Sequence, residues 1–203
     1  MSVRTVTSSR RGPLCDVVAP AAVVAAGSAV LLARPFVGGS IGSRTALFAA
    51  AYLVIAAAAA AVAGAELRFG PGGSASRTTG TMPPRAVLAM GFLALGAAAL
   101  ASGTPVPSPW TAVALPLSLL AAIAEEALFR RVLYGQLERV GPAVAVLGSA
   151  ALFALVHLPA YGTTALPVDL GAGLLFGWQR WASGTWTVPA TTHAAANLLA
   201  VLR

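Results

Sequence analysis

Long apolar runs recur along this chain of 203 residues, and they restrict its fold more than any other feature. A helix needs about 20 mostly apolar residues to cross the hydrocarbon core of a bilayer. Seven runs approach that length, so we expect an all-α, polytopic transmembrane helix bundle of about seven spans, within a range of six to eight. The runs lie near residues 17–33, 46–65, 86–101, 110 to beyond 129, 143–158, 167–181 and 188–202.

Charge is too scarce in this chain to cover a water-exposed surface. Charged residues make up 9% of the chain, whereas about a quarter of a soluble domain is charged. The net charge is +7, but the arginines lie at the edges of apolar runs and not in one basic patch. We therefore expect the lipid bilayer as a partner, and no nucleic acid.

The basic residues also predict source and orientation. All 13 are arginine, with no lysine, and alanine is abundant, which is typical of GC-rich coding and of a bacterial source. With seven spans, one side of the membrane receives only Arg34, Arg44 and Arg203, and the other side receives all the rest. The positive-inside rule then predicts a multi-pass protein of the cell (inner, cytoplasmic) membrane with a cytoplasmic N-terminus.

One polar segment interrupts the apolar pattern. Residues 70–85 are rich in Gly, Ser, Thr and Pro, which predicts a flexible loop outside the membrane. We expect residues 1–109 to form a group of N-terminal transmembrane helices around this loop. Residues 110–203 form a second group, which contains the polar candidates for a functional site.

Two adjacent acids, Glu125 and Glu126, follow the apolar part of the fourth run. An ionisable group inside the hydrocarbon costs at least about 2.5 kcal/mol, so its presence needs a reason. In one α-helix Glu126 and Arg130 share a face, and Glu125 points about 100° away. This spacing predicts that Arg130 pairs with Glu126 while Glu125 faces an internal cavity. A helix end at the membrane interface is the structural alternative for this segment taken alone.

Both histidines of the chain lie in late apolar runs. Phe153 and His157 are four residues apart, as are His193 and Asn197, so each pair shares a helix face. Three helices that each present a polar face predict a water-filled cavity. A carboxylate, two imidazoles and an amide can activate water and stabilise an oxyanion, which indicates hydrolysis of an acyl bond, most simply a peptide.

The order Glu-Glu-x3-Arg, Phe-x3-His and His-x3-Asn resembles the CPBP (ABI) family of intramembrane proteases, which are similar to type II CAAX prenyl endopeptidases. The resemblance extends from about residue 117 to the C-terminus. Its four elements are residues 125–130, residues 153–157, the glycine-containing run 171–178, and residues 186–189 leading into His193 and Asn197. It implies an intramembrane endopeptidase whose catalytic helix core is 110–203. The implied substrate is a membrane-anchored or lipidated peptide or protein, cut near its C-terminus.

Site roles follow from this resemblance, position by position. Glu125 and His157 would activate the attacking water, and His193 and Asn197 would stabilise the oxyanion. Glu126 and Arg130 would hold the site together. Phe153 would wall one side of the imidazole and contact the substrate.

The implied mechanism requires no cofactor. The alternative is a divalent metal such as zinc, for which Glu125, His157 and His193 would be the ligands.

Two other functions stay open at this stage. A proton-coupled transporter could use Glu125 and the histidines as a relay, but the first three apolar runs contain almost no polar side chain to line a path. A non-catalytic immunity or chaperone factor could keep the fold, although the intact motifs favour an enzyme.

Gly171, Gly173 and Gly177 predict close packing between helices.

Overall fold

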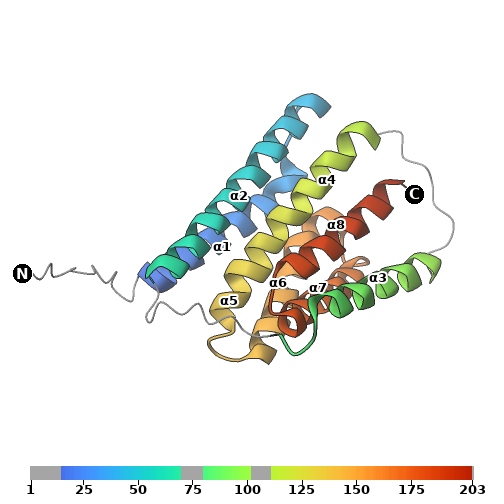
Figure 1. Ribbon diagram of the computed structural model, residues 1–203. Coiled ribbons are helices and arrows are strands. Elements are labelled where there is room, and N and C mark those ends of the chain that lie inside the picture. Colours follow the sequence, from blue (N-terminus) through green and yellow to red (C-terminus); the bar gives the residue numbers. More distant parts are fainter. Residues whose placement is uncertain (1–14, 70–79, 102–110, 203) are drawn as a thin grey trace, which may run out of the picture.

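The computed structural model describes residues 15–69, 80–101 and 111–202, and these residues form helices without any strand (Figure 1). The all-α class is thereby confirmed. The helices are α1 (Cys15–Ala33), η1 (Arg34–Phe36), α2 (Ile41–Phe69), α3 (Pro84–Ala101), α4 (Thr111–Glu126), η2 (Ala127–Leu133), α5 (Tyr134–Leu137), α6 (Pro142–Tyr161), α7 (Leu166–Ser183) and α8 (Thr187–Leu202). Each of the seven apolar runs coincides with one long helix, with α4, η2 and α5 following one another in a single rod.

Four of the described helices are long and apolar enough to cross a membrane by length and composition. They are α1 continued into η1, α2, α3 and α6. Helices α4 and α8 have only 16 residues each, and α7 carries Asp169, Gln179 and Arg180. The chain is therefore a multi-pass membrane protein. A membrane-crossing role for the other three long helices stays a prediction.

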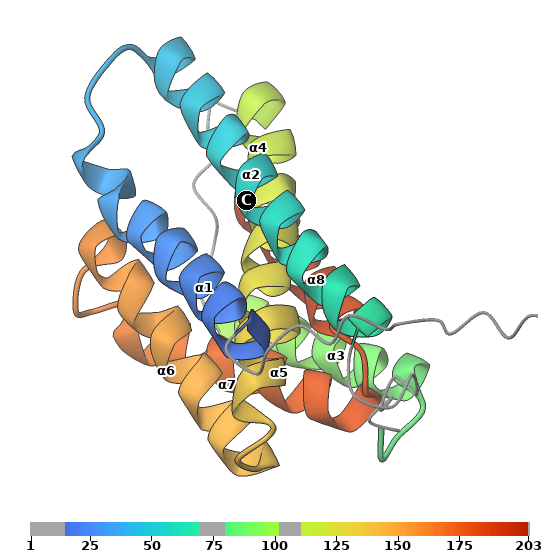
Figure 2. The same cartoon turned by 90° about the vertical axis from the view of Figure 1, so that its left-hand side faces the viewer.

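The helices form one bundle in which α4 is central (Figures 1 and 2). Helices α1 and α2 run antiparallel as a hairpin, and α2 packs on α4. On its other side α4 packs on α8, which also contacts α3 and α7, and α6 lies against α7 and α1. This arrangement places α1, α2, α4, α6 and α8 around the middle of the bundle.

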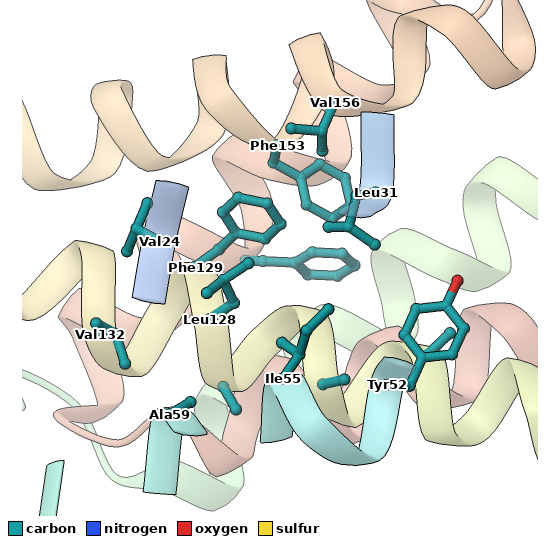
Figure 3. Close-up of a cluster of buried hydrophobic side chains, with 14 residues drawn as sticks. Val24, Leu31, Tyr52, Ile55, Ala59, Leu128, Phe129, Val132, Phe153 and Val156 are labelled. Atoms are coloured by element: carbon teal, nitrogen blue, oxygen red, sulfur yellow. The ribbon is translucent and has the colours of Figure 1, made fainter. Parts of the chain in front are cut away.

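The hydrophobic core joins the N-terminal hairpin to the later helices. Leu31 from α1 and Ile55 from α2 gather with Leu128 and Phe129 of η2 and with Phe153 of α6 (Figure 3). All five side chains are buried. Because this cluster fixes α1 and α2 against η2, it also determines which hairpin side chains approach the acids at the end of α4.

We interpreted the spacing of Glu126 and Arg130 for one regular α-helix, but the rod that carries the acids is not regular. Immediately after Glu126 the backbone becomes a π-helix over Ala127–Leu133, and the Tyr134 N–H donates to the Phe129 carbonyl five residues earlier. The apolar residues of this segment lie on all sides of the helix, so the sequence pattern does not reveal the change from α-helix to π-helix. π-Helical turns are rare and occur frequently at functional sites.

The predicted loop at 70–85 is only partly described, because residues 70–79 lie outside the described ranges. Pro84 and Arg85 belong to α3, which corrects the predicted end of the loop. Just before them, the Met82 N–H donates to the Ala182 carbonyl at 2.9 Å. Gly80 lies so close to the end of α7 that a Cβ would collide with the backbone of Ser183. This part of the loop is therefore packed against the bundle.

Two of the three glycines in α7 have the packing role predicted for them. A Cβ on Gly173 would lie 2.9 Å from Cα of Ala150 in α6, and a Cβ on Gly177 would lie 3.3 Å from Val146. The prediction was wrong for Gly171, where a Cβ would meet open space. The difference follows from the helix period, because Gly171 is two residues from Gly173 and faces away from α6.

These glycines provide a matched test of the α6–α7 contact. Gly173→Ala should lower the free energy of unfolding by about 1–3 kcal/mol, because two backbones must separate to admit the methyl group. Gly171→Ala should leave stability unchanged or raise it by up to about 1 kcal/mol, since alanine favours the helix. Thermal unfolding of the purified protein in detergent measures both. Equal midpoints for the two variants would contradict the close approach.

Candidate active site

A polar pocket of about 340 Å³ lies inside the bundle. Its polar and aromatic lining comes from five elements, η1, α2, α4, α6 and α8. These side chains are Arg34, Phe48, Tyr52, Ser118, Glu125, His157, Tyr161, His193 and Asn197. The pocket therefore contains Glu125, both histidines and Asn197, which the sequence had singled out from three separate helices.

Glu125 and His157 face one another in this pocket. The Glu125 Oε2 atom lies 3.5 Å from Nε2 of His157, and the Glu125 side chain is only 3% exposed. The other ring nitrogen, Nδ1, donates to the carbonyl of Phe153 at 2.7 Å. Since a carbonyl oxygen can only accept, Nδ1 holds a hydrogen, and the Nε2 lone pair of the neutral ring points toward Glu125. The two groups can therefore share one proton.

Glu126 forms a second carboxylate–imidazole pair behind the first. Its Oε1 atom accepts from Nδ1 of His193 at 3.0 Å, and its Oε2 atom lies 3.4 Å from Nε of Arg130. Glu126 and Arg130 are both fully buried. The structure thus contains the predicted ion pair, and it separates the two acids as their spacing indicated, with Glu125 toward the pocket and Glu126 toward the protein interior.

Aromatic rings surround the Arg130 guanidinium. Its Cζ atom lies 4.8 Å from the ring centre of Phe153 and 5.5 Å from that of Phe176, and Nη2 donates to the Gly173 carbonyl at 3.0 Å. The His193 ring stacks on Phe176 with centroids 4.9 Å apart. Cation–π contacts of a desolvated arginine are worth about 2 kcal/mol or more. Arg130 therefore joins η2, α6 and α7 beneath both imidazoles.

Phe153 lies behind the imidazoles and not at the pocket surface. Its ring centroid is 4.5 Å from that of His157 and 5.7 Å from that of His193. It is 3% exposed and does not belong to the pocket lining. It walls the His157 imidazole, as the spacing predicted, but its burial leaves no surface for the expected contact with substrate.

Asn197 completes the set from α8. Its Nδ2 atom donates to the main-chain carbonyl of Ser118 in α4 at 3.0 Å. An amide nitrogen has two hydrogens, so one remains for a ligand in the pocket. His193 lies one helical turn away on the same face, and both line the pocket.

The pocket also contains residues that the sequence did not indicate, and three of them contact the predicted pair of Glu125 and His157 or each other: Arg34, Tyr52 and Tyr161. Arg34, which had been counted only as an orientation signal, places Nη1 3.6 Å from Glu125 Oε1 and donates to the Tyr52 hydroxyl at 2.9 Å. Tyr161 stacks on His157 with centroids 5.7 Å apart and an interplanar angle of 11°. Spacing could have revealed Tyr161, four residues after His157. No sequence signal connects Arg34 or Tyr52 with the acids.

The alternative zinc site does not fit this geometry. Its ligands would be Glu125, His157 and His193, but Glu125 pairs with His157 whereas His193 pairs with Glu126. Across the described part of the chain, no three His, Cys, Asp or Glu side chains gather closely enough to hold a metal ion. We therefore derive no step through a metal.

The fold and the site together define a class, namely a multi-pass α-helical membrane protein with carboxylate–imidazole pairs at an internal pocket. Residues 107–199, just under half of the chain, match the family described as type II CAAX prenyl endopeptidase Rce1-like. This match confirms the resemblance carried by the motifs over that part of the chain, and it supports a CAAX-type intramembrane endopeptidase in general. No curated protein and no solved structure is significantly similar to the chain.

Proposed function

We propose that this protein is an intramembrane endopeptidase that hydrolyses a peptide bond with water activated by Glu125 and His157. The observation that carries the proposal is the Glu125–His157 pair, with Nε2 directed at the carboxylate by the Nδ1 hydrogen bond to Phe153. This pair opens into a pocket that also holds an amide and a second imidazole. No residue in this mechanism requires a cofactor.

The reaction uses the pair as a general base. A water between Glu125 and the scissile carbonyl gives a proton to the pair and its oxygen bonds to the carbonyl carbon, which produces a tetrahedral oxyanion. The second hydrogen of the Asn197 amide stabilises this oxyanion, and so does the Nε2–H of a protonated His193. The C–N bond then breaks, and the stored proton moves to the leaving nitrogen.

Glu126 and Arg130 support this chemistry from the interior side of the pocket. Glu126 accepts from His193 Nδ1, so the ring presents Nε2 to the pocket. Arg130 balances the charge of Glu126 and ties it to α7 through the Gly173 carbonyl. Neither needs to touch the substrate for its role.

The substrate proposed for this site is a membrane-anchored or lipidated peptide or protein, cut near its C-terminus. A pocket inside a bundle of apolar helices receives a chain already held at the bilayer more readily than a folded soluble protein. The family supports the same substrate class. We further propose a bacterial cell membrane, because all 13 basic residues are arginine, and a cytoplasmic N-terminus, because these arginines are distributed so unevenly between the two sides.

The proposal is tested with the full chain reconstituted in liposomes. A library of lipidated and transmembrane peptides is added, and cleavage products are identified by mass spectrometry. Defined products that depend on Glu125 would support the endopeptidase. Proton flux across the liposome membrane without any cleavage would instead support a relay and contradict the proposal.

Asn197→Ala should lower kcat by about 10²–10³-fold and change KM much less, because an oxyanion donor acts mainly in the transition state. Leu199→Ala is the matched control, since Leu199 lies on the same helix and is 40% exposed. Steady-state cleavage of one peptide from the library measures both. A kcat for Asn197→Ala equal to that of the control would remove Asn197 from the oxyanion site.

A further inference from the structure

Arg34 brings an incompletely bonded guanidinium into the pocket. Its Nη1 atom is used twice, toward the Tyr52 hydroxyl at 2.9 Å and toward Glu125 Oε1 at 3.6 Å. Its Nη2 atom is buried and has no hydrogen-bond partner among the described residues. The side chain as a whole is 16% exposed, and Arg34 lines the pocket. A buried, charged donor without a partner is costly, which makes this atom a candidate for a ligand.

Tyr52 contributes a second donor beside it. Because the hydroxyl oxygen accepts from Arg34 Nη1, its own hydrogen is free to be donated elsewhere. Tyr52 is 5% exposed and also lines the pocket. The Tyr161 ring lies 5.7 Å from Arg34 Cζ and helps to hold the guanidinium in place. Two donors, one of them charged, are therefore available in the same part of the cavity.

The unused donors of Arg34 and Tyr52 suit an anion. Arg34 approaches Glu125 only through Nη1, at 3.6 Å from Oε1, so Nη2 is not used by that acid. Asp169 is the other acid that acts on His157 and Arg34, and it lies in the first turn of α7, outside the pocket lining. A carboxylate suits the remaining Arg34 Nη2 and Tyr52 hydroxyl because planar anions accept several charge-assisted hydrogen bonds at once.

We propose that Arg34 and Tyr52 bind the C-terminal carboxylate of the peptide substrate and so select chain ends over internal segments. This inference rests on the proposed endopeptidase function and adds a specificity-determining residue to it. The subsite adjoins the water-activating acid, since Arg34 Nη1 is 3.6 Å from Glu125 Oε1. The pocket of about 340 Å³ is at the small end of ligand sites, so only a short stretch of peptide separates the carboxylate from the cleaved bond.

The test compares three forms of one short palmitoylated peptide. The first form has a free C-terminal carboxylate, the second a C-terminal amide, and the third a C-terminal amide with a glutamate as its last residue. Both kcat/KM for cleavage and equilibrium binding are measured for each form with the full-length protein in detergent. The third form distinguishes a terminal carboxylate from an acidic side chain.

The wild type should prefer the free acid over the plain amide by about 10- to 100-fold, the usual effect of a hydrogen bond to a charged group. Arg34→Gln should reduce this ratio to about 1, and Tyr52→Phe should reduce it several-fold while keeping the ring. Arg44→Gln, at the exposed start of α2, removes the same charge outside the pocket and should keep the full ratio. If Arg34→Gln does not fold, Tyr52→Phe decides the question.

An unchanged ratio in Arg34→Gln and Tyr52→Phe, or a wild-type ratio near 1, would overturn the inference. Equal use of the free acid and the glutamate amide would overturn the terminal carboxylate as the source of the anion. Cleavage without any preference would leave the endopeptidase intact and remove the subsite. Acid-selective binding that depends on Arg34, in the absence of any cleavage, would keep the subsite and refute the endopeptidase.

Discussion

Glu125→Gln should abolish peptide cleavage, with kcat lowered by at least about 10³-fold. The amide has the size of the carboxylate but cannot take a proton from water, and positioned general bases contribute about 10²–10⁴-fold. Glu125 contacts both His157 and Arg34, and it is the one acid among the described residues that line the pocket, so no neighbouring acid can replace it. The measurement is turnover of a library-derived peptide in liposomes, together with thermal unfolding of the same preparation.

A matched control separates lost chemistry from lost structure. Glu138→Gln removes one carboxylate at the end of α5, outside the pocket, and should keep wild-type turnover. Glu125→Gln should unfold within a few degrees of the wild type, because Arg34 keeps its bond to Tyr52 and His157 keeps its bond to Phe153. Turnover by Glu125→Gln that matches the Glu138→Gln control would remove Glu125 from the mechanism.

The helices could be located from sequence because the bilayer sets their length. In lipid, every backbone polar group needs a hydrogen-bond partner within the protein. A run of about 20 apolar residues can therefore adopt few structures there. The pairing of Glu126 with Arg130 followed from their spacing of four residues. The π-helix that begins after Glu126 did not disturb that pair, although it changes the register of everything beyond it.

The part of the pocket that the N-terminal hairpin contributes could not be predicted from the sequence, for a physical reason. Helices that are apolar all round show no preferred face, so the pattern of α1 and α2 does not say which side meets α4. That choice is made by core packing, in which Leu31 and Ile55 gather with Leu128 in one buried cluster (Figure 3). Once the hairpin docks in this way, Arg34 and Tyr52 reach Glu125 from far away in sequence.

The same packing also determines how much polar lining a transporter could use. In the sequence, the first three apolar runs contain almost no polar side chain to line a path. The structure adds Arg34 of η1, just beyond the first run, and Tyr52 of α2 to the polar lining of the pocket. What favours an enzyme is now the chemistry of the pairs. A fixed imidazole tautomer at Glu125 and a free amide hydrogen on Asn197 serve water activation and an oxyanion.

Arg130→Ala should cause the largest loss of stability, about 3–5 kcal/mol in the free energy of unfolding, with a parallel loss of cleavage. Removing the guanidinium leaves the Glu126 carboxylate fully buried with only His193 as a partner, and it leaves the Gly173 carbonyl without its donor. It also removes the cation–π contacts with Phe153 and Phe176. Thermal unfolding and peptide turnover in the same detergent measure the two effects.

Two further variants show whether charge or volume causes the loss. Arg131→Ala removes the adjacent arginine, which is half-buried over Trp186, and should cost about 1 kcal/mol or less. The double variant Glu126→Gln with Arg130→Met removes both buried charges while keeping most of the volume. It should be more stable than Arg130→Ala, because a broken buried pair costs more than a replaced one. If Arg130→Ala instead unfolds at the same temperature as Arg131→Ala, the buried ion pair does not hold the site together, and Glu126 must be stabilised by His193 alone.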